Sequence, residues 1–307
     1  MRFALTTLGT GAALPARGRS PSAQVLEANG SLYLIDCGEG TQERLREGAF
    51  NFQRIRHVFI SHMHGDHYLG LIGLISSMHL MGRKVPLEVH GPEELKEIID
   101  IQLRAGRTYL RFPLAFHPLQ PANGRVILQD DRLRVETLEL HHRLPCAGFI
   151  FRENQAPLHL RKDRVHLVPH FQRAAVKAGE DLVVEDGSVI PNAELTTPAA
   201  PARSYAYCSD TAYARELVPF LRDIDLLYHE ATFTEQLAAR ARDTMHSTAR
   251  QAAMIAREAG VRRLLLGHFS SRYKNAEVLL AEAREVFPSA ELSCDGCTYP
   301  VHSRTIV

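Results

Sequence analysis

The sequence has little that would place the protein in a membrane or outside the cell. No apolar run is long enough to span a bilayer, and no signal peptide is recognisable at the N-terminus. Cysteine is scarce: the five residues are odd in number and scattered along the chain, which favours a reducing compartment. We therefore expect a cytoplasmic protein without membrane contact.

The one C-x-x-C motif, Cys294 and Cys297, lacks the partner motif that a zinc ribbon requires. It also lacks the early strand-to-helix context of a thioredoxin-like redox pair. We interpret these two cysteines as buried or incidental thiols.

Charge of one sign is not in excess either. The net charge is +1 and the pI about 7.8, so bulk charge neither indicates nor excludes a nucleic-acid partner. Only five of the 36 basic residues are lysines. Arginine is the better bidentate ligand for phosphate, although genome composition explains such a bias equally well.

The most informative stretch is VFISHMHGDHYLG, which begins at Val58. It starts in a β-branched and aromatic run, predicted to be a buried strand, and leads into an apolar segment over 69–81, predicted to be a helix. The loop between them carries His62, His64, Asp66 and His67. Imidazole and carboxylate groups at this spacing can face two neighbouring points, which indicates binding of zinc, manganese or iron.

Further polar residues follow other predicted strands. Asp36 ends one strand, where it is either a turn cap or a carboxylate that orients a ligand histidine. His141 and His142 end another, and spacing alone does not choose between them. Additional strand ends and loops carry Asp210, His229, Glu230, His246 and His268. Strands that alternate with helices and deliver such residues at their tips predict a layered α/β enzyme.

The segment from Arg152 to Arg203 breaks this alternation. It is proline-rich and weakly periodic, so we expect little contribution to a compact core. Five basic residues lie between Arg161 and Lys177 against one acid, and acidic residues follow from Glu180. The segment is either a solvated insertion or a protruding arm whose basic half contacts phosphates.

The order of motifs resembles the metallo-β-lactamase fold superfamily and, more closely, the ribonuclease Z (tRNase Z) family of tRNA 3′-processing endoribonucleases. The similar stretches run nearly end to end: LGTGAALPARGRSPSA, IDCGEGTQ, ISHMHGDHYLGLIGLISSMHLMG, HHRLPCAGFIF, YCSDTAY, YHEATF, HSTARQAA and LLGHFSSRY. The resemblance implies an α/β fold, a four-layer αββα sandwich. It implies one domain over 1–307, with a protruding arm insertion at about 152–203.

The resemblance also implies a site with two zinc ions per chain. His62, His64 and His142 match the ligands of the first ion, and Asp66, His67 and His268 match those of the second. Asp210 matches the carboxylate that bridges both ions. Asp66, His246 and Glu230 match catalytic positions, with His246 and Glu230 beside the scissile phosphate.

The implied function is removal of the 3′ trailer of precursor tRNA by a homodimer whose arm grips the substrate bound to the partner subunit. Two cations would lower the pKa of a water held between them and neutralise phosphate oxygens. Asp66 would hold the proton of that water, and His246 would protonate the leaving 3′-oxygen. The alternatives are a small-molecule phosphodiesterase or sulfatase on the same fold, and a non-catalytic RNA-binding protein.

Overall fold

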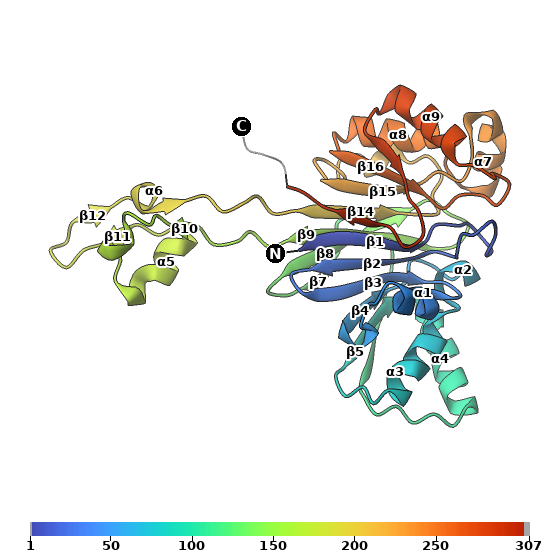
Figure 1. The fold of residues 1–307 in the computed structure, drawn as a ribbon, viewed down its shortest axis with the longest axis horizontal. Coiled ribbons are helices and arrows are strands. Elements are labelled where there is room, and N and C mark those ends of the chain that lie inside the picture. The colour runs from blue at the N-terminus through green and yellow to red at the C-terminus, as the bar shows by residue number, and fades with distance from the viewer. Residues whose placement is uncertain (1, 304–307) are drawn as a thin grey trace.

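The computed structural model describes residues 2–303 and places two seven-stranded sheets face to face. Helices cover the outer surface of each sheet, and one long segment projects from the sandwich (Figure 1). The predicted four-layer αββα arrangement is therefore confirmed. In the described residues, no helix combines the length and apolar character needed to cross a membrane.

The first sheet has the strand order β18-β1-β2-β3-β4-β5-β6. Its strands are β1 (Phe3–Gly9), β2 (Ala23–Ala28), β3 (Ser31–Cys37), β4 (Ile55–Phe59), β5 (Leu87–Gly91), β6 (Leu114–Pro118) and β18 (Thr298–Pro300). Its helices are α1 (Thr41–Glu47), α2 (Gly65–Tyr68), α3 (Leu71–Leu80) and α4 (Glu93–Ala105). Asn29 and Gly30 join β2 to β3 with φ of 49° and 84°, the left-handed turn that this dipeptide favours in hairpins.

The second sheet has the order β17-β16-β15-β14-β9-β8-β7. Its strands are β7 (Val126–Gln129), β8 (Leu133–Leu140), β9 (Cys146–Glu153), β14 (Ser204–Cys208), β15 (Leu226–Glu230), β16 (Arg263–Gly267) and β17 (Ala290–Leu292). Its helices are α7 (Ala238–Thr244), α8 (Ala249–Glu258) and α9 (Glu277–Val286). Thr248 and Gln251 form the predicted capping box at the start of α8.

Alternation along the strands builds the layers. In β14, Tyr205 and Tyr207 face the space between the sheets, whereas Ala206 and Cys208 face the helices. Large aromatic side chains from both sheets, including Phe59 of β4, fill the central layer. This rigid double sheet holds the strand ends, and the loops that follow them, at fixed positions.

The segment between β9 and β14 forms the protruding arm. Its elements are β10 (His159–Leu160), α5 (Arg173–Ala178), β11 (Leu182–Val183), β12 (Val189–Ile190), α6 (Asn192–Leu195) and β13 (Thr196–Thr197), with 3₁₀ turns at Val165–Leu167 and His170–Gln172. As expected, the arm adds nothing to the core of the sandwich. It nevertheless packs a small core of its own from Val168, Val176, Leu182 and Leu195. Weak periodicity hid this core because the arm's helices are too short to show a repeating apolar stripe.

The structure corrects the interpretation of the C-x-x-C motif. Cys294 and Cys297 are joined in a disulfide in the turn between β17 and β18. The other three cysteines, Cys37, Cys146 and Cys208, are free and buried. The motif closes a short turn between two edge strands, a context that sequence spacing did not reveal.

Candidate metal centre

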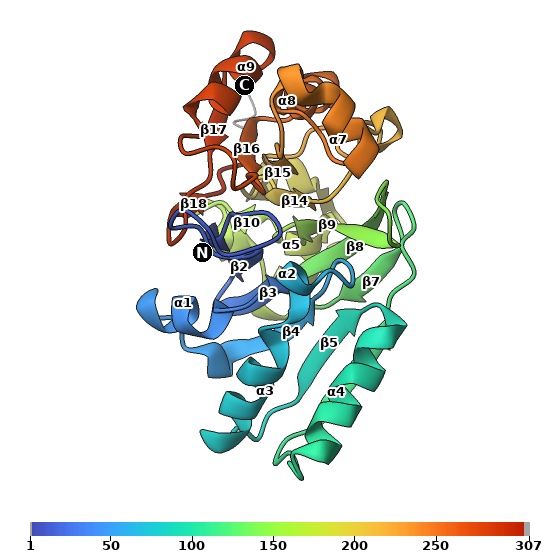
Figure 2. The ribbon, with the colours of Figure 1, turned by 90° about the vertical axis from the view of Figure 1, so that its right-hand side faces the viewer.

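The candidate site is assembled where strands of both sheets end. The loop after β4 supplies the HMHGDH residues, and the second sheet contributes residues that follow β8, β14 and β16. These tips and helix α2 lie at the end of the sandwich seen in Figure 2. Asp36, Asp210 and His268 have φ of 55°, 59° and 56°, a left-handed conformation uncommon for non-glycine residues. Such conformations cluster at functional sites, where the surrounding structure holds them.

A first group of possible ligands contains His62, His64, His142 and Asp210, and its ligand atoms all lie within 4.8 Å of one another. His64 Nδ1 is 2.9 Å from His62 Nε2 and 3.2 Å from His142 Nε2. Asp210 Oδ1 lies 3.9 Å from His62 Nε2 and 3.8 Å from His142 Nε2. Three imidazole nitrogens therefore converge on one point beside a carboxylate oxygen.

A second group contains Asp66, His67 and His268. Asp66 Oδ2 is 3.4 Å from His67 Nε2 and 3.6 Å from His268 Nε2. The other oxygen of Asp210, Oδ2, approaches the same two nitrogens at 3.2 and 3.3 Å. Asp210 thus presents one oxygen to each group, the arrangement of a carboxylate shared by two ions.

Two of these histidines each have a buried ring nitrogen that no protein group satisfies and that a metal ion could bind. His67 Nε2 and His268 Nε2 are buried and have no hydrogen-bond partner, and leaving such atoms unpaired is unfavourable. Their Nδ1 atoms are hydrogen-bonded, to Asp36 Oδ2 at 2.7 Å and Thr232 Oγ1 at 3.0 Å. This is the pattern of metal-binding histidines, in which one nitrogen is oriented by the protein and the other faces the ion.

The same pattern extends to the first group. His62 Nδ1 is 3.0 Å from Ser61 Oγ, and His142 Nδ1 is 3.0 Å from the carbonyl oxygen of Met245. Burial lowers the pKa of His62, His64 and His142 and so favours neutral imidazole, the form that binds metal. The protein therefore orients two of the three rings, and all three favour the neutral form that binds an ion such as zinc.

A carboxylate and a histidine stand beside these groups. Burial lowers the pKa of His246, but the contact of its Nδ1 with Glu230 Oε1 at 2.9 Å outweighs burial and raises the pKa to about 9. Glu230 is fully buried and also accepts hydrogen bonds from the backbone N–H groups of Thr211 and Ser247, at 2.7 and 3.1 Å. Glu230 is therefore fixed by the backbone, and it holds His246 protonated at neutral pH.

A pocket of about 440 Å³ opens over the two groups, and His64, Asp66, Asp210, His246 and His268 all line it. Two exposed arginines stand at its rim, Arg143 directly after His142 and Arg272 four residues after His268. Sequence reasoning missed both, although their position next to candidate ligands was a usable signal. Arginine at the rim suits a substrate that carries phosphate.

The structure brings together the seven candidate metal ligands and the two further catalytic candidates predicted from the sequence, His246 and Glu230. It also separates alternatives that the sequence left open. His142 belongs to the first group, whereas His141 is exposed and pairs with Glu216. Asp36 is fully buried and contacts His67, so it orients this ring and is not a surface cap. His229 lies under the site, hydrogen-bonded to the carbonyl oxygen of Glu230.

Comparison with known proteins agrees with this geometry. A family model described as "Anti-Pycsar protein Apyc1" matches residues 3–285. A ribonuclease Z of Bacteroides fragilis is 45% identical over 294 residues, which cover 95% of this chain and 97% of that protein. A ribonuclease Z of Bacteroides thetaiotaomicron is 44% identical over 99% of this chain and 97% of its own length. The chain belongs to the ribonuclease Z family.

Solved structures support the same conclusion at the level of the fold. The short form of human tRNase Z is similar with a TM-score of 0.71 and 27% identity, covering 97% of this chain and 99% of that one. The metallo-β-lactamase fold protein YhfI from Bacillus subtilis has a TM-score of 0.69 at 20% identity, covering 98% and 100%. The sandwich architecture of this chain is thus shared with solved structures, and the chain itself contains a His/Asp cluster able to hold metal.

Proposed function

We propose that this protein is the endoribonuclease that removes the 3′ trailer of precursor tRNA. The products are a tRNA that ends in a 3′-hydroxyl and a trailer that begins with a 5′-phosphate. The observation that carries the proposal is identity of about 45% with ribonucleases Z along nearly the whole chain, joined to a pocket where possible metal ligands face the His246–Glu230 pair.

The proposed cofactor is two zinc ions per chain. His62, His64 and His142 would hold one, Asp66, His67 and His268 the other, and Asp210 would bridge them. When bound, the ions would supply an activated water and neutralise phosphate oxygens. The convergence of the imidazole nitrogens, the lowered pKa of His62 and the two oxygens that Asp210 presents, one to each group, support this assignment.

The residues of the chain then divide the proton transfers. Asp66 Oδ2 accepts a hydrogen bond from the backbone N–H of Ala13 at 2.8 Å, which fixes the carboxylate at the pocket where it can take the proton of the attacking water. His246, protonated and held by Glu230, donates a proton to the leaving 3′-oxygen. Arg143 and Arg272 at the rim would contact phosphates that flank the cut.

The chain is proposed to work as one catalytic domain, residues 1–307, in a cytoplasmic homodimer. The arm, about residues 152–203, extends from the end of the sandwich opposite helix α2, so it points away from its own pocket (Figures 1 and 2). An arm in this position is suited to grip a tRNA bound to the partner subunit. Arg161, Lys162 and Arg164 are exposed on it, with Arg161 and Arg164 paired to Asp163, and would contact phosphates.

The test is incubation with a 3′-extended tRNA transcript and mapping of the cut. We expect cleavage next to the discriminator nucleotide, a free 3′-hydroxyl on the tRNA and a 5′-phosphate on the trailer. Bis(p-nitrophenyl) phosphate, run in parallel, measures the hydrolytic centre by itself. Hydrolysis of this small ester without any cut in the transcript would refute the tRNA substrate and favour the small-molecule phosphodiesterase alternative.

A further inference from the structure

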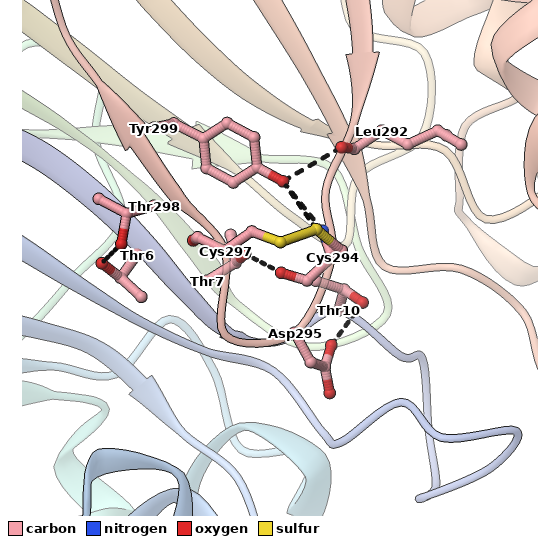
Figure 3. Close-up of a disulfide and its surroundings, with 9 residues drawn as sticks. All are labelled: Thr6, Thr7, Thr10, Leu292, Cys294, Asp295, Cys297, Thr298 and Tyr299. Atoms are coloured by element: carbon pink, nitrogen blue, oxygen red, sulfur yellow. Dashed lines mark hydrogen bonds between the residues drawn. A yellow bond between two sulfur atoms is a disulfide. The ribbon is translucent and has the colours of Figure 1, made fainter. Parts of the chain in front are cut away.

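The disulfide between Cys294 and Cys297 is connected to the candidate metal centre by a short series of contacts. Cys294 is an exposed residue whose Sγ lies 3.4 Å from Tyr299 Oη, whereas the three free cysteines are buried. The bridge closes the turn that joins β17 to β18, and Figure 3 shows the residues around it. A solvent-exposed bridge over two intervening residues is open to exchange with thiols in a way that buried sulfur is not.

The ring closed by the disulfide contains Asp295, whose two carboxylate oxygens hold both ends of one loop. Asp295 Oδ1 accepts a hydrogen bond from Thr10 Oγ1 at 2.7 Å, drawn in Figure 3. Asp295 Oδ2 accepts one from the backbone N–H of Ser20 at 2.6 Å. The loop between Thr10 and Ser20 is therefore clamped at its base by a residue that the disulfide encloses.

That loop forms part of the wall of the metal pocket. Ala12, Ala13 and Pro15 line the pocket. The N–H of Ala13 donates to Asp66 Oδ2, a proposed metal ligand and proton acceptor. The N–H of Ala12 donates to the carbonyl oxygen of Phe269, the residue after His268. The loop thus contacts both segments that supply the second ligand group.

Other contacts hold the turn independently of the sulfur bridge. Thr7 Oγ1 donates to the carbonyl oxygen of Cys294 at 2.6 Å, and the N–H of Gly296 donates to the carbonyl oxygen of Thr7 at 2.7 Å. These bonds link the turn to strand β1 without involving the sulfur atoms. Because the strand pairing does not depend on the bridge, its opening would act locally, on the ring that encloses Asp295, without unfolding the sheet.

We propose that Cys294 and Cys297 form a reversible thiol–disulfide exchange site whose oxidised form fixes the Thr10–Ser20 wall of the catalytic pocket. The reactant is a dithiol reductant. One of its thiolates attacks Cys294 Sγ, the sulfur–sulfur bond breaks, and Cys297 leaves as a thiolate. The second thiol then attacks the mixed disulfide. The protein gains two electrons and two protons, and the dithiol becomes a disulfide.

The effect of this site on turnover rests on the proposed tRNA-processing function. In the oxidised form Asp295 stays within reach of Thr10 and Ser20, and the wall is ordered. In the reduced form the clamp loosens, the N–H of Ala13 contacts Asp66 less often, and cleavage slows. In reducing compartments disulfides that do form are typically transient or redox-sensing, which agrees with an exchange site and not with a permanent staple.

The experiment equilibrates the zinc-loaded protein in mixtures of reduced and oxidised dithiothreitol. Alkylation followed by mass spectrometry should show two added groups, confined to Cys294 and Cys297, in the reduced sample. Hydrogen exchange of peptides covering residues 10–21 should be about tenfold faster in the reduced form, because the Ser20 amide loses its acceptor part of the time. Cleavage of a 3′-extended tRNA should be severalfold slower in the reduced form.

Two variants serve as controls. The double variant Cys294→Ser with Cys297→Ser should behave as reduced protein in every mixture, which separates loss of the bridge from extraction of zinc by the dithiol. Asp295→Ala keeps the bridge but removes the clamp, so exchange at residues 10–21 should be fast in both redox states. Unchanged exchange in the wild type on reduction would overturn the inference, whether or not tRNA is cut. Absence of tRNA cleavage in both states, with redox-dependent exchange intact, would instead count against the proposed function.

Discussion

Among single residues, His246 contacts Glu230, which supports its proposed role in proton transfer, and its ligand atom also lies within 4.8 Å of ligand atoms from Asp210 and His268. The Nδ1 of His246 is held by Glu230, which leaves the opposite ring nitrogen available to the pocket. The candidate ligands His62 and His142 have instead a lowered pKa, because burial disfavours their charged form. Burial would likewise lower the pKa of His67, but the carboxylates of Asp210, Asp36 and Asp66 outweigh burial and raise this pKa as well. The proposed acid role of His246 therefore depends on its contact with Glu230 and on its place in the pocket as well as on its protonation.

Replacement of His246 by alanine should therefore slow single-turnover cleavage of precursor tRNA by about a hundredfold or more, the usual contribution of a general acid. Hydrolysis of bis(p-nitrophenyl) phosphate should change little, because its acidic leaving group needs no proton. Quenched-flow cleavage and zinc content are the measurements. The matched control is His141→Ala, an exposed histidine outside the cluster. A tRNA cleavage rate within a few-fold of wild type would exclude the acid role.

The sequence predicted the candidate ligands and offered Asp36 as one orienting group, which the structure confirms, but it did not predict the other orienting groups. The H-x-H-x-D-H spacing is local, so His62, His64, Asp66 and His67 could be found without a structure. The Nδ1 atoms of His268 and His142 contact the hydroxyl of Thr232 and the carbonyl oxygen of Met245, and chain folding brings these partners from distant segments. The same holds for the choice between His141 and His142, which depends on how the loop after β8 turns.

Among the secondary-structure elements, the strands and the hairpin at Asn29 and Gly30 were predictable from the sequence. Alternation with a period of two residues and the residue types of a tight turn both depend on neighbouring residues alone. The arm was harder. Its core joins Val168 and Val176 to Leu182 and Leu195 through elements of two to six residues, which carry no readable period. The disulfide turn was missed for a related reason, since its meaning depends on the pairing of β18 with β1.

The arm's basic side should supply affinity for tRNA. Replacing both Lys162 and Arg164 by glutamate should raise the KM for precursor tRNA by about tenfold. The slope of the logarithm of the binding constant against the logarithm of salt concentration should become shallower by roughly one for each lost phosphate contact. Turnover of bis(p-nitrophenyl) phosphate should stay unchanged. Glu180→Lys with Glu185→Lys is the matched control on the acidic side of the arm, and it should not raise the KM. Equal KM values for wild type and the basic-side variant would rule out this role.

At the scale of the whole molecule, the candidate metal centre joins the two halves of the sandwich. His62, His64, Asp66 and His67 come from the loop after β4 of the first sheet, whereas Asp210 and His268 follow strands of the second sheet. Ions bound between them would tie the sheets together at one end. Metal binding would then stabilise the folded chain as well as serve hydrolysis, because the unfolded chain holds no preformed site.

The most direct measurement is the zinc content of purified protein after equilibration with zinc and removal of the free ion. We predict about two zinc ions per chain, and a substantial loss of bound zinc in Asp210→Ala, because Asp210 offers an oxygen to both ligand groups. Less than one ion per chain in the wild type, or full retention of zinc in Asp210→Ala, would contradict the metal centre on which the proposed function depends.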